Sequence, residues 1–440
     1  MSPTRQADVV IVGAGLGGML SALLLAREGY RTIVLERLPY PGGRYTSLDD
    51  QGYSINTGAW AVGLHGTNGP LWKLLVELGV NVDVRVPQPV PAHLRLKDKD
   101  IPLPPKGQLR TIIDAVSRSE QEATRVMAAI RQGLFWQEPS DELTIEQWLH
   151  LYTDNPLIHS QFNYISRSTT GLDYDVFPAG EYFRLLRGFG QCGSLTAIAR
   201  NGQKTTMDAM VARLEQMHAL LELQTEVKHI ACSRGKVEGV LAVGPDGEQL
   251  NVIAPVVISD VGPEETVKLA SQSSFDPGFL QQVAKLAPTM AVVTVFGHDK
   301  PLLDCEGRIQ FIETDRLATV WEPCQLWPEY APPGRSCLYT YATMRTDDTD
   351  KELALIIEQC QERLPSLAGV EIIAQLLFKQ QWPMLRARPA RCLGIRTPVP
   401  GLYLAGDAVN VSGWTGGEGI SFSSWAIAED VKMRFSKDGF

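Results

Sequence analysis

The sequence lacks the residue patterns that mark disulfide-rich, metal-binding and membrane-spanning proteins. Its seven cysteines are scattered without a C-x-x-C pair, and its seven histidines show no H-x-x-x-H spacing. We therefore expect free thiols in a reducing compartment and no metal site. No window reaches about 18 uninterrupted apolar residues, so the sequence predicts no transmembrane helix.

A concentration of basic residues is also missing. The chain has 41 Lys and Arg against 50 Asp and Glu, a formal charge of −9, and no dense basic run. A nucleic-acid-binding protein needs a concentrated basic face, so we predict no nucleic-acid partner. The N-terminal stretch offers no uninterrupted apolar core before a cleavage site, because glycines interrupt it. We therefore expect no secretory signal and a cytoplasmic protein.

What the sequence does contain is a strand, a glycine turn, a helix and a second strand near its start. The apolar, β-branched run 7–12 predicts a buried parallel strand, and the turn GAGLGG (13–18) follows it. The run 19–28 is rich in Leu and Ala and predicts a helix. The run 32–35 predicts a strand that leads into Glu36. This order and spacing are typical of a dinucleotide-binding fold.

Each part of this unit has a mechanical reason. Gly13 permits the tight turn, Gly15 lets the backbone approach a pyrophosphate, and Gly18 lets helix and strand pack closely. The helix N-terminus supplies free N–H groups and a partial positive charge for phosphates. Glu36, 23 residues after Gly13, is placed to accept hydrogen bonds from the ribose hydroxyls of an adenosine. The unit alone does not separate FAD from NAD.

The residues that follow Glu36 resemble a known group. Residues 37–44 read RLPYPGGR, and the resulting pattern E-x5-GGR resembles the FAD signature of phytoene desaturases, carotenoid isomerases and flavin amine oxidases. The resemblance implies a non-covalently bound FAD, with Gly42, Gly43 and Arg44 around its diphosphate, which the rigid fork of an arginine suits. It also implies an α/β fold. In that fold a discontinuous Rossmann-like FAD-binding domain joins a mixed-sheet and helical substrate domain, as in glutathione reductase and amine oxidases.

Further matches to this group run along the chain. The segment SINTGAW (54–60) resembles the short strand that ends near the isoalloxazine, and TEV (225–227) resembles the strand whose valine pairs with the adenine. GLYLAGD (401–407) resembles the site for the ribitol and diphosphate, and TGGEGI (415–420) opens a final helix aimed at the flavin. The predicted cofactor contacts are Gly13, Gly15, Leu16, Gly17, Gly18, Glu36, Arg37, Gly42, Gly43, Arg44, Gly58, Ala59, Trp60, Val227, Gly406, Asp407, Gly417, Gly419 and Ile420.

The matches divide the chain into predicted domains. Residues 1–85, 195–270 and 395–440 form the FAD-binding domain, residues 86–194 the helical part of the substrate domain, and residues 271–394 its sheet part. A pocket between the two domains would hold the substrate. The predicted elements of the substrate domain are helices over 109–134, 143–152 and 351–363 and strands over 290–296 and 336–341.

Aromatic and basic side chains are the candidates for the substrate pocket. Trp414 matches one wall of the aromatic cage that amine oxidases place over the flavin, and Trp382 resembles a tryptophan that packs near it. No catalytic base stands out, and His65 and Tyr182 are guesses. Three arginines of the helical part could bind a carboxylate or phosphate, although solvated surface arginines are commoner: Arg167, Arg184 and Arg187.

Two positions depart from the pattern of the group. Asn56 stands where many relatives carry an aspartate, so a role that depends on this charge is not transferred. Residues 200–203 read RNGQ in place of the usual Pro-x-Gly-Gly turn, which leaves the role of that loop open.

The predicted chemistry rests on a missing lysine. Many amine oxidases place a lysine near the flavin on a substrate-domain strand, and the corresponding run 287–296 contains none. Cys392 is followed by Leu393 and Gly394 rather than by tyrosine, so we expect no covalent tether to FAD. We favour a desaturase- or dehydrogenase-like oxidoreductase whose flavin accepts a hydride from a C–H bond of a largely apolar small molecule.

Several alternatives remain open. The chain could instead be a flavin amine or amino-acid oxidase, a redox-neutral flavin-dependent isomerase, or a relative that uses FAD only structurally. The segment IPLPP (101–105) is compatible with peripheral membrane contact, and an exposed connector is the simpler interpretation. The sequence leaves the oligomeric state open.

Overall fold

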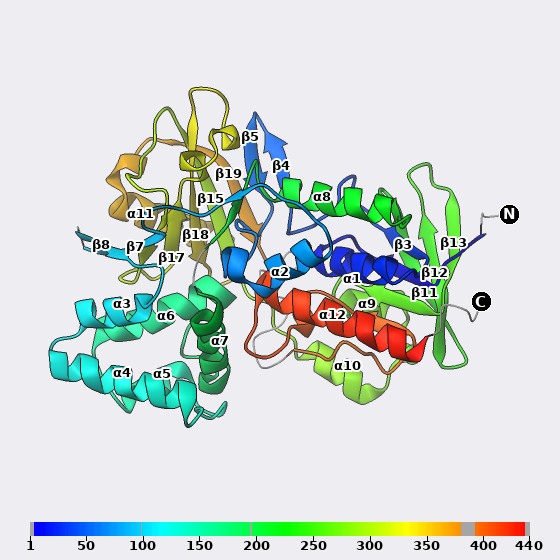
Figure 1. Cartoon of the computed structure of the whole chain (residues 1–440), viewed down its shortest axis with the longest axis horizontal. Coiled ribbons are helices and arrows are strands. Elements are labelled where there is room, and N and C mark those ends of the chain that lie inside the picture. The colour runs from blue at the N-terminus through cyan, green and yellow to red at the C-terminus, as the bar shows by residue number, and fades with distance from the viewer. Residues whose placement is uncertain (1–3, 98, 194–195, 380–391, 436–440) are drawn as a thin grey trace.

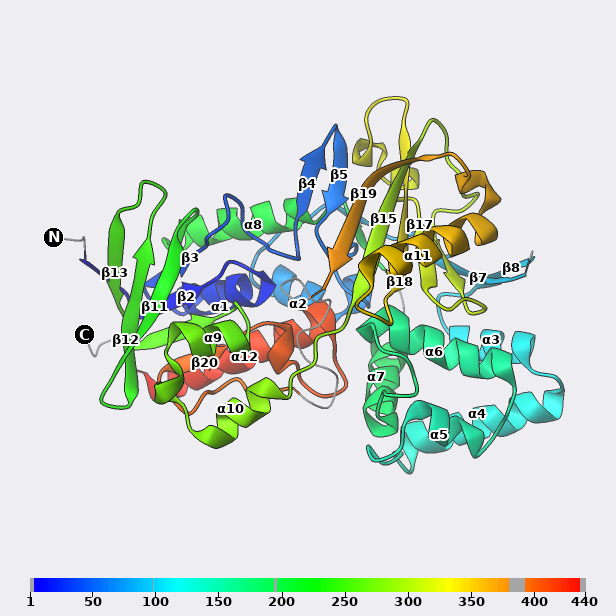
Figure 2. The same cartoon turned by 180° about the vertical axis from the view of Figure 1, so that it is seen from behind.

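The computed structural model describes residues 4–97, 99–193, 196–379 and 392–435, which form two lobes side by side (Figure 1, Figure 2). One lobe is built on a five-stranded parallel sheet, and the other is built on a seven-stranded mixed sheet. The chain passes between the lobes more than once, so each lobe combines segments that are distant in the sequence.

The five-stranded sheet is the centre of the first lobe. Its strands are β2 (Val9–Val12), β3 (Thr32–Leu35), β10 (Leu220–Glu222), β14 (Val256–Ser259) and β20 (Leu402–Leu404). They lie in the order β10-β3-β2-β14-β20, and all neighbours are parallel. Every residue of β2 is buried, because Val9 and Ile11 face one core while Val10 and Val12 face another.

Helices cover one face of this sheet, and a second sheet covers the other. The helices of the first face are α1 (Leu16–Arg27), α2 (Pro70–Glu77), α8 (Gln203–Gln216) and α12 (Gly416–Arg434). The opposite face carries β1 (Thr4–Gln6), β11 (Glu226–Ser233), β12 (Lys236–Val243), β13 (Gln249–Ile253), α9 (Pro263–Leu269) and α10 (Pro277–Ala284). The four strands form a sheet in the order β1-β13-β12-β11. Both faces of the parallel sheet are therefore buried, as its apolar strands require.

The seven-stranded sheet is the centre of the second lobe. Its strands are β7 (Ala92–Leu96), β8 (Lys99–Leu103), β15 (Ala291–His298), β16 (Arg308–Phe311), β17 (Leu317–Trp321), β18 (Ser336–Thr343) and β19 (Glu371–Phe378). They lie in the order β19-β15-β18-β17-β16-β7-β8. α11 (Thr349–Arg363) packs on one face with Val292 and Phe296 of β15. Val293 and Val295 face the opposite side, toward the helices of this lobe.

Five helices gather beside that opposite side (Figure 1). They are α3 (Gln108–Val116), α4 (Glu120–Phe135), α5 (Ile145–His150), α6 (Pro156–Thr170) and α7 (Ala179–Cys192). The single helix predicted over 109–134 is wrong, because the chain breaks between α3 and α4. Ser119 caps α4 by accepting a hydrogen bond from Glu122 N at 3.2 Å. Ser119 interrupts the apolar periodicity of the sequence, and it was the available signal for this helix start.

The range 86–194, predicted to be helical, also contains strands. β7 and β8 form a hairpin, and β7 pairs with β16, so both strands extend the seven-stranded sheet. Their short, proline-interrupted sequence did not reveal this pairing. Two smaller pairs join the lobes, namely β4 (Ser47–Asp50) with β5 (Tyr53–Asn56) and β6 (Val84–Arg85) with β9 (Ile198–Ala199).

The predicted fold class is confirmed: a parallel α/β lobe is combined with a mixed-sheet and helical lobe. The strands of the parallel sheet come from all three ranges predicted to form one domain, and the exact domain boundaries stay a prediction. Among the helices of the described residues, none has both the length and the apolar character that crossing a membrane requires.

Candidate functional site

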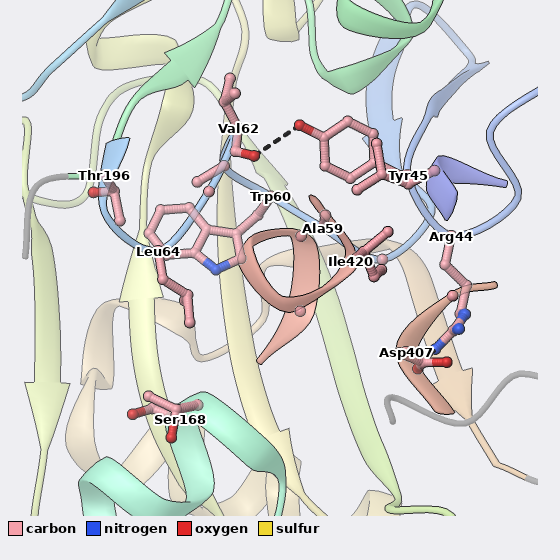
Figure 3. Close-up of a pocket in the computed structure, with 18 of the residues that line it drawn as sticks. Arg44, Tyr45, Ala59, Trp60, Val62, Leu64, Ser168, Thr196, Asp407 and Ile420 are labelled. Carbon is pink, nitrogen blue, oxygen red and sulfur yellow. Dashed lines mark hydrogen bonds and ion pairs between the residues drawn. The ribbon is translucent and has the colours of Figure 1, made fainter. Parts of the chain in front are cut away.

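A cavity of about 1620 Å³ lies between the two lobes. Its lining combines strand ends of the parallel sheet, the N-termini of α1 and α12, and one side of the seven-stranded sheet. Figure 3 shows Trp60 and Leu64 on one side of the pocket and Ser168 of α6 on the opposite side. A small-molecule pocket is about 300–1,000 Å³. The cavity is therefore large enough for a cofactor and a substrate together.

Glycines bring the N-terminus of α1 close to two strand ends. A Cβ at Gly17 would lie 2.6 Å from Gly406 N, and a Cβ at Gly18 would lie 2.2 Å from Gly13 O. Only residues without a Cβ allow this approach. Gly15 is the N-cap of α1 and has no side chain with which to cap the helix. The first turn of α1 consequently lines the cavity as a ready anion-binding surface.

Glu36 lies at the end of β3 beside this turn. The side chain is buried, Oε2 accepts a hydrogen bond from Ala14 N at 2.7 Å, and Oε1 accepts one from Leu38 N at 2.8 Å. A carboxylate offers about four acceptor positions, so two remain for the hydroxyls of a ribose. Thr225 and Val227 line the same part of the cavity.

Arg44 provides a fixed positive charge further along the cavity. Its Nη1 donates a hydrogen bond to Asp407 Oδ2 at 2.9 Å (Figure 3). Burial lowers the pKa of the Arg44 guanidinium, but the carboxylates of Asp407 and Asp260 outweigh this effect, so the pKa is raised. A permanently charged fork held at this place suits a diphosphate.

Asp260 was missed by the sequence reasoning. It directly follows β14, and its Oδ2 accepts a hydrogen bond from Gly18 N at 2.9 Å. A Cβ at Gly15 would lie 2.4 Å from the same oxygen. The available signal was its position, because ligands of parallel α/β sheets bind at the carboxyl ends of the strands.

The other end of the predicted cofactor site lies near Trp60. The loop that follows β5 is held by a hydrogen bond from Ala59 N to Arg44 O at 2.9 Å, and the Trp60 ring lies 4.4 Å from that of Trp321. The N-terminus of α12 reaches this region, and its N-cap Thr415 makes no side-chain cap. Its free N–H groups can therefore stabilise negative charge on a ligand.

Nearly all the predicted cofactor contacts line this one cavity; the exceptions are Gly18 and Gly419. Gly18 packs against Gly13, and a Cβ at Gly419 would lie 2.6 Å from the Asn410 side chain. Both glycines are thus needed for packing. The contacts with FAD themselves stay a prediction.

The departures found in the sequence have structural roles. Asn56 Oδ1 accepts hydrogen bonds from Ser47 Oγ at 2.8 Å and from Gln203 N at 3.2 Å. The RNGQ turn is fixed from the other side by Ser54 Oγ, which donates to Asn201 O at 2.9 Å. Asn56 therefore links the β4–β5 hairpin to the start of α8.

The aromatic candidates for catalysis do not meet in the cavity. His65 and Trp414 pack ring against ring at 5.6 Å behind the described lining, and Tyr182 stacks on Phe162 at 5.5 Å in the helical core. Burial lowers the pKa of the His65 imidazole, although its Nδ1 hydrogen-bonds the Gly193 carbonyl. Ring packing accounts for the positions of His65, Trp414 and Tyr182, and a catalytic role for them stays a prediction. Trp382 lies outside the described residues.

The three candidate arginines also lie outside the described lining of the cavity. Arg184 binds Asp141 at 2.6 Å and Glu181 at 2.9 Å, and Arg187 binds Glu138 at 2.5 Å. Arg167 is 1% exposed and donates to the Thr314 carbonyl at 2.9 Å. Carboxylates of the second lobe therefore engage Arg184 and Arg187, whereas Nε and Nη1 of Arg167 are buried without a hydrogen-bond partner among the described residues. A substrate anion at these arginines stays a prediction.

The described residues suit FAD at each of its parts. Glu36 keeps acceptor positions for the ribose, and the glycine turn and Arg44 meet the needs of the diphosphate. Asp407 binds Arg44 and lines the same cavity. The glycine-opened N-terminus of α12 suits the pyrimidine side of the flavin ring.

Comparison with known proteins decides the family. The sequence profile of the flavin containing amine oxidoreductase family matches residues 16–428. The chain belongs to this family. An uncharacterized protein of Methanocaldococcus jannaschii is 24% identical over 93% of this chain and 96% of its own length. The 15-cis-phytoene desaturase of Solanum lycopersicum is 21% identical over 98% of this chain and 79% of its own.

A solved structure supports the same assignment. An oxidoreductase from Methanosarcina mazei superposes with a TM-score of 0.86 and 25% identity, over 97% of this chain and 100% of that one. The predicted superfamily and cofactor are thus confirmed: the protein is an FAD-dependent oxidoreductase.

Proposed function

We propose that this family member oxidises a C–H bond of an elongated, largely apolar substrate. The observation that carries the proposal is the charge of the substrate part of the cavity. Among the described lining residues from 105–196 and 288–378 there is no Asp or Glu, whereas four cations are present: Lys106, Arg110, Arg131 and Arg308. Such a surface repels a protonated amine, which favours a neutral or anionic substrate over an amine.

The wall formed by the seven-stranded sheet supports an apolar reacting group. Val293 of β15 and Phe378 of β19 line the cavity there, and Leu64 and Ile420 close it from the first lobe. β15 begins within the run 287–296, which corresponds to the lysine-bearing strand of many amine oxidases, and it presents Val293 to the cavity instead. An apolar, water-poor wall of this kind orients a hydrocarbon segment by shape.

Bound FAD supplies a two-electron acceptor for hydride. The chain contributes position and electrostatics. The first turns of α1 and α12 direct N–H groups at negative charge, and Arg44 neutralises the diphosphate. The apolar wall excludes water from the reacting segment. The Tyr164 hydroxyl, 3.1 Å from Thr319 Oγ1, ties α6 to the seven-stranded sheet and fixes the width of the cavity.

Anaerobic titration of the FAD-loaded protein tests this function. We expect the visible flavin absorbance to fall with a polyene or a long acyl compound and to stay unchanged with a primary amine. Bleaching by amines alone, with hydrogen peroxide release in air, would make the protein an amine oxidase. A double-bond isomer formed without net oxidation would indicate a redox-neutral isomerase, and a flavin inert to all probes a structural role.

We also propose that FAD is held without a covalent bond. Burial raises the pKa of the Cys392 thiol to about 12, so the thiol stays protonated and weakly nucleophilic. Cys392 is not among the described residues that line the cavity. Release of the flavin upon denaturation checks this proposal.

Peripheral contact with a lipid surface is a further part of the proposed function. Phe135 lines the cavity and is 73% exposed, so the cavity reaches the surface beside it, and the adjacent Trp136 is 82% exposed. Arg131, one turn earlier on α4, and Lys106 line the same opening. Exposed aromatic residues beside cations suit the interface of an anionic membrane, from which an apolar substrate can enter.

A further inference from the structure

The substrate part of the cavity has a polar region besides the cations Lys106, Arg110 and Arg131. Three carboxamides and a guanidinium line it: Gln108 of α3, Gln161 of α6, and Arg308 and Gln310 of β16. These side chains take no part in the chemistry described above.

The fold places Gln161, Arg308 and Gln310 on facing elements, and α3, which begins at Gln108, packs against α6. Tyr164 of α6 contacts Thr319 of β17 at 3.1 Å, and Thr319 lies directly opposite Gln310 across the β16–β17 pair. Gln161 precedes Tyr164 by one helical turn, so both lie on the same face of α6. Arg308 and Gln310 are two residues apart and project from the same face of β16. β16 and α6 thus face each other across the cavity.

One polar atom of each carboxamide lacks a hydrogen-bond partner among the described residues. Among the described residues, Gln161 Oε1, Gln310 Nε2 and Gln108 Nε2 are buried without a hydrogen-bond partner. Gln161 is 1% exposed and Gln310 is 3% exposed. A buried polar atom that stays unpaired costs about 1–3 kcal/mol. A polar ligand, or water, must therefore satisfy these groups.

The local charge indicates the sign of that ligand. Arg308 is cationic, and α3 begins at Gln108 with neither a side-chain cap nor an acidic residue in its first turn. The free N–H groups of this helix end add a partial positive charge beside Gln108. With no carboxylate in the described lining of this part, the region is suited to an anion.

We propose that this region binds the anionic head group, a carboxylate or a phosphate monoester, of the substrate. The inference rests on the proposed function and adds a head group to the apolar substrate. Thr169 of α6 lies near the N-terminus of α12, because Thr415 Oγ1 donates to its carbonyl at 3.4 Å. Gln161 precedes it by eight residues, about 12 Å of helix. An apolar chain of about that length would join the head group to the reacting carbon.

Calorimetric titration of the FAD-loaded protein with dodecanoate, dodecyl phosphate and dodecan-1-ol tests the site. We expect one of the two anions to bind at least tenfold more tightly than the alcohol, and the comparison of the two shows which head group fits. In Arg308→Met this preference should disappear while binding of the alcohol is unchanged. Gln310→Leu should weaken the preferred anion about threefold to tenfold.

Matched controls exclude an effect of charge or folding alone. Arg125→Met and Gln121→Leu remove an exposed arginine and an exposed glutamine of α4, and both should keep the preference for the anion. Unfolding temperature and FAD content confirm that each variant is folded. Equal binding of alcohol and anions by the wild type, as expected if water alone fills the region, would overturn the inference. An equal loss in Arg125→Met and Arg308→Met would do the same.

The two proposals can fail separately. A protein that prefers the anion but whose flavin no polyene or acyl compound reduces has the head-group site without the proposed oxidation. A protein whose flavin is reduced, yet which binds anion and alcohol equally, oxidises its substrate without this site.

Discussion

At the N-terminus of α1, the Asp260 carboxylate accepts a hydrogen bond from Gly18 N at 2.9 Å, beside the place predicted for the FAD diphosphate. Two negative groups at one helix end repel each other. Asp260→Asn keeps an oxygen acceptor for Gly18 N and removes the charge. We expect FAD to bind about fivefold more tightly, equivalent to about 1 kcal/mol, as measured by flavin fluorescence titration.

Asp246→Asn is the matched control for this variant. Asp246 is exposed in the turn between β12 and β13, and its substitution should leave the FAD affinity unchanged. If Asp260→Asn weakens FAD, the carboxylate must organise the site, through the nearby Arg44, more than it repels the diphosphate.

Gly17 offers a second test at the scale of one residue. A Cβ there would lie 2.6 Å from Gly406 N and 3.0 Å from Gly406 Cα, so Gly17→Ala must push backbone against backbone. We expect a loss of about 1–3 kcal/mol in the free energy of unfolding and a lower FAD content. Gly394→Ala is the control, because a Cβ at Gly394 meets nothing within 4 Å. Equal melting temperatures for the two variants would contradict the close approach of α1 and β20.

Among the elements, α12 is anchored near its end as well as at its ligand-facing start. Asp430 of α12 binds Tyr403 at 2.7 Å and Arg396 at 2.8 Å, which ties the helix to β20 and the segment before it. Burial raises the pKa of the Asp430 carboxyl, but hydrogen bonds from Arg396, Tyr403 and Arg434 outweigh this and lower the pKa to about 2.

This lowered pKa predicts how stability depends on pH. An aspartate whose folded pKa lies below its unfolded value of about 4 stabilises the protein above pH 4, and this contribution is lost as the pH falls from about 4 to about 2. Asp430→Asn should lower the free energy of unfolding by about 1–2 kcal/mol at pH 7, because solvent screens the exposed arginine partners. Urea unfolding at pH 7 and pH 3 should show a smaller difference from the wild type at pH 3.

Glu429→Gln supplies the control for this prediction. Glu429 binds Lys432 at 2.8 Å on the exposed side of α12, and such surface pairs contribute about 0–1 kcal/mol. Its stability should therefore stay close to that of the wild type at both pH values. A gap between Asp430→Asn and wild type that widens on acidification would show that the carboxyl is not held ionised in the folded state.

The same elements show what the sequence could and could not predict. β3 was predicted with its observed bounds, 32–35, because a strand buried on both faces reads as one apolar run. The cofactor residues were found because each lies in a short motif at a strand end or a helix start. β7 and β8 were missed because their place in the sheet depends on pairing with β16, about 200 positions away.

Pairing between distant residues also explains why the sequence said little about the substrate pocket. Arg184 looked available for a ligand, but Asp141 and Glu181 bind it in the folded chain. Conversely, Gln161 and Gln310 looked ordinary, because the cavity that they share exists only when α6 and β16 face each other. Local motifs therefore predicted the cofactor end of the site and left the substrate end to the three-dimensional structure.

At the scale of the whole molecule, the cavity extends from the parallel sheet of one lobe to an opening beside Phe135 on the helical part of the other. Each lobe supplies one requirement. The first holds the cofactor through helix ends and fixed charges, and the second surrounds the substrate with a sheet and helices. Glu181 of α7 accepts a hydrogen bond from Gly413 N at 2.6 Å, which joins the helical part to the loop before α12. This hydrogen bond therefore links the two lobes beside the cavity.

The opening beside α4 gives the prediction that belongs to this scale. The FAD-loaded protein should sediment with vesicles of phosphatidylcholine and phosphatidylglycerol, because Phe135 and Trp136 are exposed beside Arg131. Replacing both aromatic residues by serine should lower the affinity for vesicles at least about a hundredfold, since each loses about 1.5–3 kcal/mol of apolar burial in the lipid. Added salt should weaken binding of the wild type by screening the cationic contribution.

Trp425→Ser tests whether vesicle binding depends on the residues at the opening or on exposed apolar residues in general. Trp425 is 52% exposed on α12, in the lobe away from the opening, so its loss should leave vesicle binding unchanged. If Trp425→Ser and the double serine variant lose binding equally, the protein has no preferred orientation on lipid, and the substrate must reach the cavity from water. If only the double variant loses binding, and flavin reduction by a vesicle-borne substrate slows with it, the opening receives the substrate directly from the membrane.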